Sequence, residues 1–274
     1  MKKIGLVLGG GGARGVASIG IMKALYERDL RPDVIVGTSM GAMIGAFLAD
    51  GYSPEQIHRI ALKTSWFKVL DFAATAGILK GDRFDKWLGE QLPHEFSDLT
   101  IPLVVTAVDI DTGELLTLRE GNLPLAVRAT CAFPGAFVPV NINGRNLVDG
   151  GLRSTVPVHI LKEFDIDTII ACDFQPPLNR KVIDEGVVDK PMAALTRFWE
   201  SVTFKRRNLA ADILLKAVDI LQTDICHRQL EENPPDLLIR PPMPNINLED
   251  FNSMEEIIAA GYNETVKALD EAGW

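Results

Sequence analysis

Cysteine and histidine are scarce in this sequence. Its 274 residues include three cysteines and four histidines. The cysteines Cys131, Cys172 and Cys226 lie far apart and cannot all pair, and no Cys-x-x-Cys spacing occurs, which argues against a disulfide framework and a zinc ribbon. We therefore expect the reducing cytoplasm as the compartment. No His, Cys and Asp residues have the spacing of metal ligands, so neither a metal nor an organic cofactor is expected.

Basic residues are few relative to acidic ones. Lys and Arg number 28 against 37 Asp and Glu, which gives a net charge of −9. Because binding to a phosphate backbone needs clustered cations, this balance argues against nucleic acid as the main partner. It also disfavours attachment to an anionic membrane by charge alone.

Long apolar runs are missing as well. The longest, residues 34–49, is interrupted by Gly37-Thr38-Ser39 and is shorter than the roughly 20 residues that a membrane-spanning helix needs. Near the start, Lys2-Lys3 precede a short apolar run in the manner of a signal peptide. Four glycines follow at once, however, so we predict a first strand there.

The opening of the chain predicts two strand–turn–helix units. An apolar run at 4–8 is followed by glycines and then by helical spacing over 13–28. A second apolar run at 34–36 ends in a glycine-bearing turn, and a helix rich in small residues follows until Gly51. Two such units within fifty residues predict a parallel or largely parallel sheet.

The rest of the chain predicts further strands and a helical C-terminal part. Asn143-Gly144 is the strongest hairpin signal. A polar, proline-bearing stretch at 175–189 indicates a surface loop and is followed by a helical pattern over 191–231. We also expect strands at 101–109, 114–118, 168–174 and 237–240 and helices at 83–92, 125–131 and 255–271. Since no linker divides the chain, we expect one domain over 1–274, with a core at about 3–174 and a helical part at 190–274 packed on it.

The strongest chemical motif is Gly37-Thr38-Ser39-Met40-Gly41, a G-x-S-x-G sequence between a predicted strand and a predicted helix. A serine on such a sharp turn projects its hydroxyl from the end of the sheet. The N-terminus of the following helix offers N–H groups and a positive dipole end to a developing oxyanion. Ser39 is therefore a candidate nucleophile, although a tight turn with an incidental serine has the same pattern.

The glycine loop at 10–15 allows two interpretations. It fits G-x-G-x-x-G, the dinucleotide fingerprint, which requires an acidic residue at the end of the second strand. Asp33 precedes that strand instead of ending it, so nucleotide binding is the weaker interpretation. A backbone free of side chains also suits an oxyanion hole, with Arg14 supporting the loop or the charge.

A serine nucleophile needs a base. None of the four histidines lies in a recognisable turn motif, although His159 or His227 would complete a Ser–His–Asp triad. Asp149 ends a predicted strand and precedes Gly150-Gly151, which would let it approach another chain segment closely. A turn aspartate that accepts nearby N–H groups is the alternative.

Taken together, three motifs resemble those of the patatin-like phospholipase family, in the family's order. They are Gly10-Gly11-Gly12-Ala13-Arg14-Gly15, Gly37-Thr38-Ser39-Met40-Gly41 and Asp149-Gly150-Gly151. The stretch 129–139 before the aspartate is similar too, and the resemblance covers roughly residues 3–174. Gly9, where some members have an acid, and Thr130, where a serine is frequent, depart from the commonest pattern.

The resemblance implies a three-layer α/β/α fold with a mostly parallel central sheet and a Ser–Asp dyad without histidine. It implies that Ser39 is the nucleophile and Asp149 the base. It implies further that the N–H groups of Gly11 and Gly12, with Gly10, form the oxyanion hole, while Arg14, Gly37, Gly41, Gly150 and Gly151 support the site. The expected chemistry is hydrolysis of acyl esters of phospholipids or lysophospholipids through an acyl-enzyme.

Two aromatic groups are candidates for a rim around the substrate entrance. They are Trp66, Phe67, Leu70 and Phe72, and Phe198, Trp199, Val202 and Phe204, the second followed by Lys205-Arg206-Arg207. Burial in the core is the stronger interpretation of both. The expected partner is a lipid or acyl-ester substrate, with peripheral membrane contact as an option; the oligomeric state does not follow from the sequence. A regulatory protein of the same fold with little activity, and less favoured a nucleotide-binding oxidoreductase, remain as alternatives.

Overall fold

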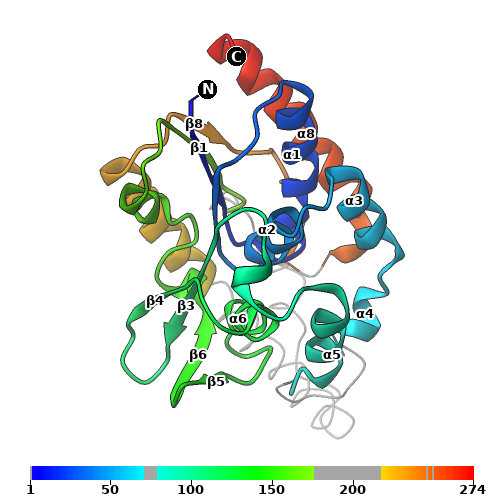
Figure 1. Cartoon of the computed structure of the whole chain (residues 1–274), viewed down its shortest axis with the longest axis vertical. Helices are drawn as coiled ribbons and strands as arrows, with labels where there is room; N and C mark the ends of the chain where they lie inside the picture. Colours follow the sequence, from blue (N-terminus) through cyan, green and yellow to red (C-terminus); the bar gives the residue numbers. More distant parts are fainter. Residues whose placement is uncertain (1, 71–78, 176–216, 245, 249) are drawn as a thin grey trace, which may run out of the picture.

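One mixed sheet organises the fold (Figure 1). The computed structural model describes residues 2–70, 79–175, 217–244, 246–248 and 250–274. In this part of the chain eight strands form a sheet in the order β5-β6-β3-β2-β1-β7-β8, with β4 also paired to β3. The strands are β1 (Ile4–Leu8), β2 (Val34–Gly37), β3 (Leu103–Asp109), β4 (Leu115–Leu118), β5 (Val140–Ile142), β6 (Arg145–Asp149), β7 (Thr168–Cys172) and β8 (Leu237–Ile239).

The middle of the sheet is parallel and one end is antiparallel. Strands β3, β2, β1, β7 and β8 pair in parallel, whereas β4, β5 and β6 pair antiparallel. Helical segments connect the parallel strands, whereas turns join β3 to β4 and β5 to β6. The helices are η1 (Gly12–Val16), α1 (Ala17–Glu27), α2 (Met40–Ala49), α3 (Pro54–Lys63), α4 (Trp66–Val69), α5 (Asp82–Gln91), η2 (Phe96–Asp98), α6 (Leu123–Thr130), η3 (Gly150–Leu152), η4 (Val158–Glu163), a helix at 217–232, η6 (Phe251–Ser253) and α8 (Met254–Ala272).

Alternating strand residues enter two separate cores. In β1, Leu6 and Leu8 contact the large core under α1, α2 and α8, whereas Val7 contacts a smaller core on the opposite face. That smaller core includes Leu161 of η4 and Cys226 of the 217–232 helix. Figure 1 shows α1, α3 and α8 on one side of the sheet and the η4 and 217–232 segments on the other. The expected α/β fold with a mostly parallel central sheet is confirmed.

Most of the expected elements occur within a few residues of their expected bounds. Both residues of the Asn143-Gly144 turn have positive φ, 52° and 81°, as a two-residue hairpin requires. The first turn of the helix expected from Ala13 is a 3₁₀ helix. The helix expected from residue 125 begins at Leu123, because the side chain of Asn122 caps it by accepting the N–H of Leu125 at 2.8 Å. The loop expected at 175–189, and the helix over 191–216, lie outside the described residues beyond Gln175.

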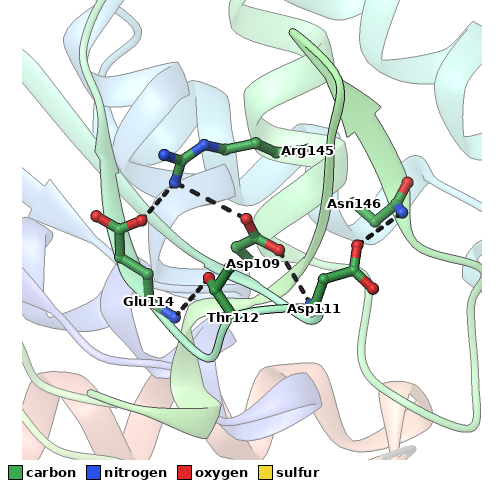
Figure 2. A network of polar contacts seen from close by, with 6 residues as sticks. All are labelled: Asp109, Asp111, Thr112, Glu114, Arg145 and Asn146. Atoms are coloured by element: carbon green, nitrogen blue, oxygen red, sulfur yellow. Dashed lines mark hydrogen bonds and ion pairs between the residues drawn. The ribbon is translucent and has the colours of Figure 1, made fainter.

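A polar network joins the two antiparallel hairpins at the end of the sheet (Figure 2). Arg145 of β6 forms ion pairs with Glu114 and with the buried Asp109 of β3. Beside it, Asn146 donates a hydrogen bond to Asp111 at 3.0 Å. These contacts hold β6 against β3 at the end of β6 that is opposite to Asp149.

Helices α1 and α8 approach each other through two glycines. A Cβ atom on Gly20 would lie 1.9 Å from the carbonyl oxygen of Ile258, and one on Gly261 would lie 2.2 Å from that of Ala17. The backbones are therefore in direct contact, and side-chain-free positions are needed on both helices. No helix among the described residues is both long and apolar enough to cross a membrane.

We predict that Gly20→Ala destabilises the protein by about 1–3 kcal/mol, because the added methyl group overlaps the α8 backbone. Gly89→Ala is the matched control, since a Cβ at this exposed position of α5 has no neighbour within 4 Å. The control should be neutral or more stable by up to about 1 kcal/mol, reflecting helix propensity alone. Urea unfolding of both variants tests this, and equal stabilities would contradict the proposed backbone contact.

Candidate active site

Ser39 lies on a strained turn between β2 and α2. Its backbone has φ 53° and ψ −127°, an unusual conformation for a residue other than glycine. The turn is tight because α2 crosses close to β1: a Cβ atom on Gly41 would lie 2.2 Å from the carbonyl oxygen of Leu8. A residue without a side chain is therefore needed two positions after the serine. Ser39 itself is only half-buried. This geometry is that of a nucleophile elbow.

Two threonines hold this turn in place. The N–H of Ser39 donates a hydrogen bond of 2.8 Å to Oγ1 of Thr130, which is fully buried at the end of α6. The hydroxyl groups of Thr38 and Thr106 of β3 are 2.7 Å apart. Sequence reasoning noted Thr130 only as a departure from a family pattern. Its contact with Ser39 joins segments 91 residues apart, and no local signal predicts that.

Asp149 lies at the end of β6 with 3% of its surface exposed. One carboxylate oxygen, Oδ1, accepts the N–H of Gly151 at 2.8 Å, and the Ser39 hydroxyl lies beside the carboxylate. Burial raises the pKa of Asp149 from 3.8 to about 6, while the Gly151 N–H and the nearby Ser39 hydroxyl lower it. The expected pair of Ser39 and Asp149 is thus brought into contact.

A small cavity of about 30 Å³ contains this pair and the glycine loop. Sequence reasoning named six of its lining residues, which are Gly10, Gly11, Gly12, Arg14, Ser39 and Asp149, and Gly151 as a supporting residue. It missed the other five, Phe133, Thr155, Gln175, Gln222 and Leu248. Phe133 lies in the family-like stretch 129–139, although no role was assigned to it. The other four come from segments without a recognisable motif, and only the fold brings them to the cavity.

The N–H groups of the glycine loop differ in what they bind. That of Gly10 donates to the carbonyl oxygen of Thr155 at 3.0 Å. Within the described part of the chain, no hydrogen bond is formed by the N–H of Gly11 or Gly12, and both residues line the cavity. Arg14 is buried and its Nε lies 3.5 Å from the carbonyl oxygen of Gly11, where it supports the loop.

The other expected site residues lie elsewhere. Asp33 accepts the N–H of Ile4 at 2.7 Å, at the beginning of β1, whereas the glycine loop follows the end of β1. An acid at the opposite end of the strands cannot hold the ribose of a dinucleotide on this loop. His159 lies in η4, where burial lowers its pKa, and His227 is exposed. Neither lines the cavity that contains Ser39.

Cys131 is a neighbour of the dyad that sequence reasoning did not assign to the site. Its thiol is close enough to Ser39 for a hydrogen bond, and burial together with the charge of Asp149 raises the pKa of Cys131 far above its ordinary value. A thiol held neutral in this way is a poor nucleophile. Ser39 therefore remains the better candidate for attack on a substrate.

The first aromatic group is divided between core and surface. Trp66 is buried, stacks on Phe251 at a centroid distance of 5.5 Å and contacts the edge of Trp87. Leu70 is buried, whereas Phe67 is 61% exposed. Phe72 and the whole second group at 198–207 lie outside the described residues. Among the residues that are described, no cluster of His, Cys, Asp and Glu could hold a metal ion.

Comparisons with known proteins give a consistent assignment. Residues 6–162 match the family described as patatin-like phospholipase. An uncharacterized NTE family protein of Mycobacterium bovis is 28% identical and covers 98% of this chain and 91% of its own length. Lysophospholipase NTE1 of Coccidioides immitis is also 28% identical over 98% of this chain, which spans only 18% of that protein.

The relatives differ widely in length. The chain spans about a fifth of the length of the animal proteins that it matches. Among solved structures, VipD from Legionella pneumophila has a similar fold, with a TM-score of 0.63 and 18% identity, over 98% of this chain and 67% of VipD.

We predict that Asp149→Asn stabilises the fold at neutral pH. The pKa of Asp149 is raised from 3.8 to about 6 in the folded protein. Ionising this carboxyl group therefore costs on the order of 3 kcal/mol more in the folded state than in the unfolded state. The stability of the wild type therefore falls as pH rises through about 6, whereas the neutral amide of the variant does not titrate. Urea unfolding at about pH 7.5 should show a more stable variant, and the difference should shrink towards pH 4. A difference independent of pH would contradict the argument.

Proposed function

Because this chain belongs to the patatin-like phospholipase family, a family of lipid ester hydrolases, we propose that it cleaves acyl esters of lipids with Ser39 as nucleophile and Asp149 as base. The observation that carries this proposal is that the two side chains lie beside each other in one cavity with the glycine loop. No histidine is needed, since the serine proton has an acceptor beside it.

Acylation begins with the transfer of the Ser39 hydroxyl proton to Asp149. The Ser39 oxygen attacks the ester carbon, and the resulting tetrahedral intermediate carries a negative charge on the former carbonyl oxygen. As the intermediate collapses, Asp149 returns its proton to the leaving alcohol. A pKa of about 6 suits both steps, because the carboxylate is ionised at neutral pH and is a stronger base than an exposed aspartate.

The oxyanion is stabilised by the N–H groups of Gly11 and Gly12. Both lie at the beginning of η1 and line the cavity with Ser39. The N–H of Gly10 already donates to Thr155, so in this proposal Gly10 forms the wall behind Ser39 and is not a donor. Its position supports that role, because a Cβ on Gly10 would lie 3.4 Å from Cβ of Ser39. Fixed N–H donors at a developing charge are typically the largest single contribution to acyl transfer.

The substrate class in this proposal is a phospholipid or lysophospholipid, cleaved in the manner of a phospholipase A or lysophospholipase. The name of the Coccidioides relative supports it. We also propose that residues 1–274 form one patatin-like domain, since β8 extends the sheet and α8 packs on α1. Contact with a membrane would be peripheral, and Leu62 of α3 is an exposed apolar side chain that suits it.

Two other functions have less support. A regulatory protein with an idle dyad would not need Ser39 to be strained, half-exposed and placed beside a buried carboxylate. A nucleotide-binding oxidoreductase would need an acid near the glycine loop, and Asp33 is at the far end of the strands. Ester hydrolysis explains more of the observed contacts than either.

We predict that Ser39→Ala and Asp149→Asn each reduce hydrolysis of p-nitrophenyl esters to background, because nucleophile or base is lost. His159→Ala and His227→Ala are the controls and should keep the wild-type rate, since neither histidine lines the cavity. Folding of every variant is checked by circular dichroism. Full activity of Ser39→Ala, or loss of activity in either histidine variant, would overturn the Ser–Asp mechanism.

The pH dependence follows from the raised pKa of Asp149. We predict that kcat/KM falls as pH drops through about 6, because protonated Asp149 cannot accept the Ser39 proton. Above about pH 6, kcat/KM should reach a plateau. The substrate is an ester that does not itself titrate in this pH range, so that the profile reports the enzyme. A profile that falls only near pH 4 would mean that an ordinary, exposed carboxylate is the base.

A further inference from the structure

Gln222 is a buried amide at the catalytic cavity. It lies in the 217–232 helix, is 8% exposed and lines the cavity together with Ser39 and Asp149. The same face of this helix is anchored to the protein one and two turns later. Cys226 is buried in the smaller core, and Gln229 bonds Oγ of Ser154 at 2.8 Å and the carbonyl oxygen of Arg153 at 3.0 Å. The position of Gln222 is therefore fixed by packing.

The amide of Gln222 and the carboxylate of Asp149 converge over Gly151. A Cβ atom on Gly151 would lie 3.0 Å from Nε2 of Gln222 and 3.1 Å from Oδ1 of Asp149. A side chain at position 151 would thus separate the two groups. Within the described part of the chain no hydrogen bond is formed by the Gln222 amide, whereas Gln229, on the same helix, uses both of its polar atoms. An amide that is fixed at the cavity and not used within the protein can bind a water molecule there, which points to a role in the reaction.

The second half of the proposed reaction supplies that role. Deacylation needs a water molecule that gives one proton to Asp149 while its oxygen attacks the acyl carbon bound to Ser39. The tetrahedral intermediate then collapses, the bond between the carbon and the Ser39 oxygen breaks, and Asp149 returns the proton to that oxygen as the free acid leaves. The second hydrogen of the water needs an acceptor. The amide oxygen of Gln222 supplies it after a half-turn of the amide group, because the amide atom that now lies nearest to Asp149 is the donor Nε2.

We propose that Gln222 is a positioning residue that orients the water of deacylation against Asp149. This inference rests on the proposed function, because it requires an acyl-enzyme on Ser39. It gives Gln222 no part in acylation, in which the ester itself occupies the attacked position. The effect of replacing Gln222 should therefore be confined to one half of the reaction.

The test compares Gln222→Met with Glu231→Met, a change at an exposed position of the same helix outside the cavity. Each protein is mixed rapidly with a p-nitrophenyl ester, quenched in acid, and the acyl-enzyme is followed by intact mass spectrometry. Gln222→Met should lose its acyl group about tenfold more slowly than the wild type, the effect of one hydrogen bond lost from a transition state. Its kcat and KM should fall together where deacylation limits turnover, leaving kcat/KM unchanged, because that ratio reports acylation alone.

A second nucleophile provides an independent readout. Hydroxylamine attacks an acyl-enzyme without help from Asp149, so it should accelerate turnover of Gln222→Met far more than that of the wild type or of Glu231→Met. If Gln222→Met fails to fold, Gln222→Asn, which withdraws the amide by one methylene group, should show the same selective loss. An unchanged rate of acyl loss, or equal losses in kcat and kcat/KM, would overturn the role of Gln222. An absence of any acyl-enzyme in the wild type would instead overturn the proposed function itself.

Discussion

A carboxylate buried beside a serine hydroxyl is the interaction on which this site depends. Burial of Asp149, which has 3% of its surface exposed, raises its pKa above the ordinary value. The nearby Ser39 hydroxyl and the N–H of Gly151 oppose this effect, and the balance leaves the pKa at about 6. An exposed aspartate would be a weaker base, and one buried without these donors would keep its proton to higher pH. The contacts around Asp149 thus set its strength as a base.

Strand β3 brings the two members of this pair together. Gly37, two residues before Ser39, pairs with Val105, and Asp149 pairs with Ala107 further along the same edge of β3, whose other edge is taken by β4. Because β2 runs parallel to β3 and the chain continues for two residues past Gly37, the serine reaches the level of Asp149. Thr106 lies between these two positions and contacts both segments, through the hydroxyl of Thr38 and the backbone at Gly150. Since β6 runs antiparallel to β3, its last residue faces the end of β2 along this edge, and Asp149 meets Ser39 there.

Features encoded in short stretches of sequence were predictable, and features that depend on distant segments were not. The strands from Ile4 and Val34, the Asn143-Gly144 turn and the contact of the three motifs follow from local spacing and from a family resemblance. Two hydrogen bonds at the site join segments separated by 91 residues or more. The N–H of Gly10 donates to the carbonyl oxygen of Thr155, and the N–H of Ser39 donates to the hydroxyl of Thr130. Contacts of this kind depend on how loops pack, for which one sequence holds no periodic signal.

The cavity has two walls of different origin, and this bears on how such a site changes. Ser39, Asp149 and the glycine loop all fall within residues 6–162, the part that matches the family. Gln175, Gln222 and Leu248 lie beyond it and form the facing wall. Chemistry that depends on β3 and its neighbours is constrained by the sheet, because a shift of one strand moves every side chain on it. Of the facing wall, Leu248 is bound to the glycine loop, because its carbonyl oxygen accepts the N–H of Ala13 at 2.7 Å. The side chains of Gln175 and Gln222 can change without moving a strand, so we expect differences in rate and selectivity among proteins with these motifs to arise mainly at these two positions.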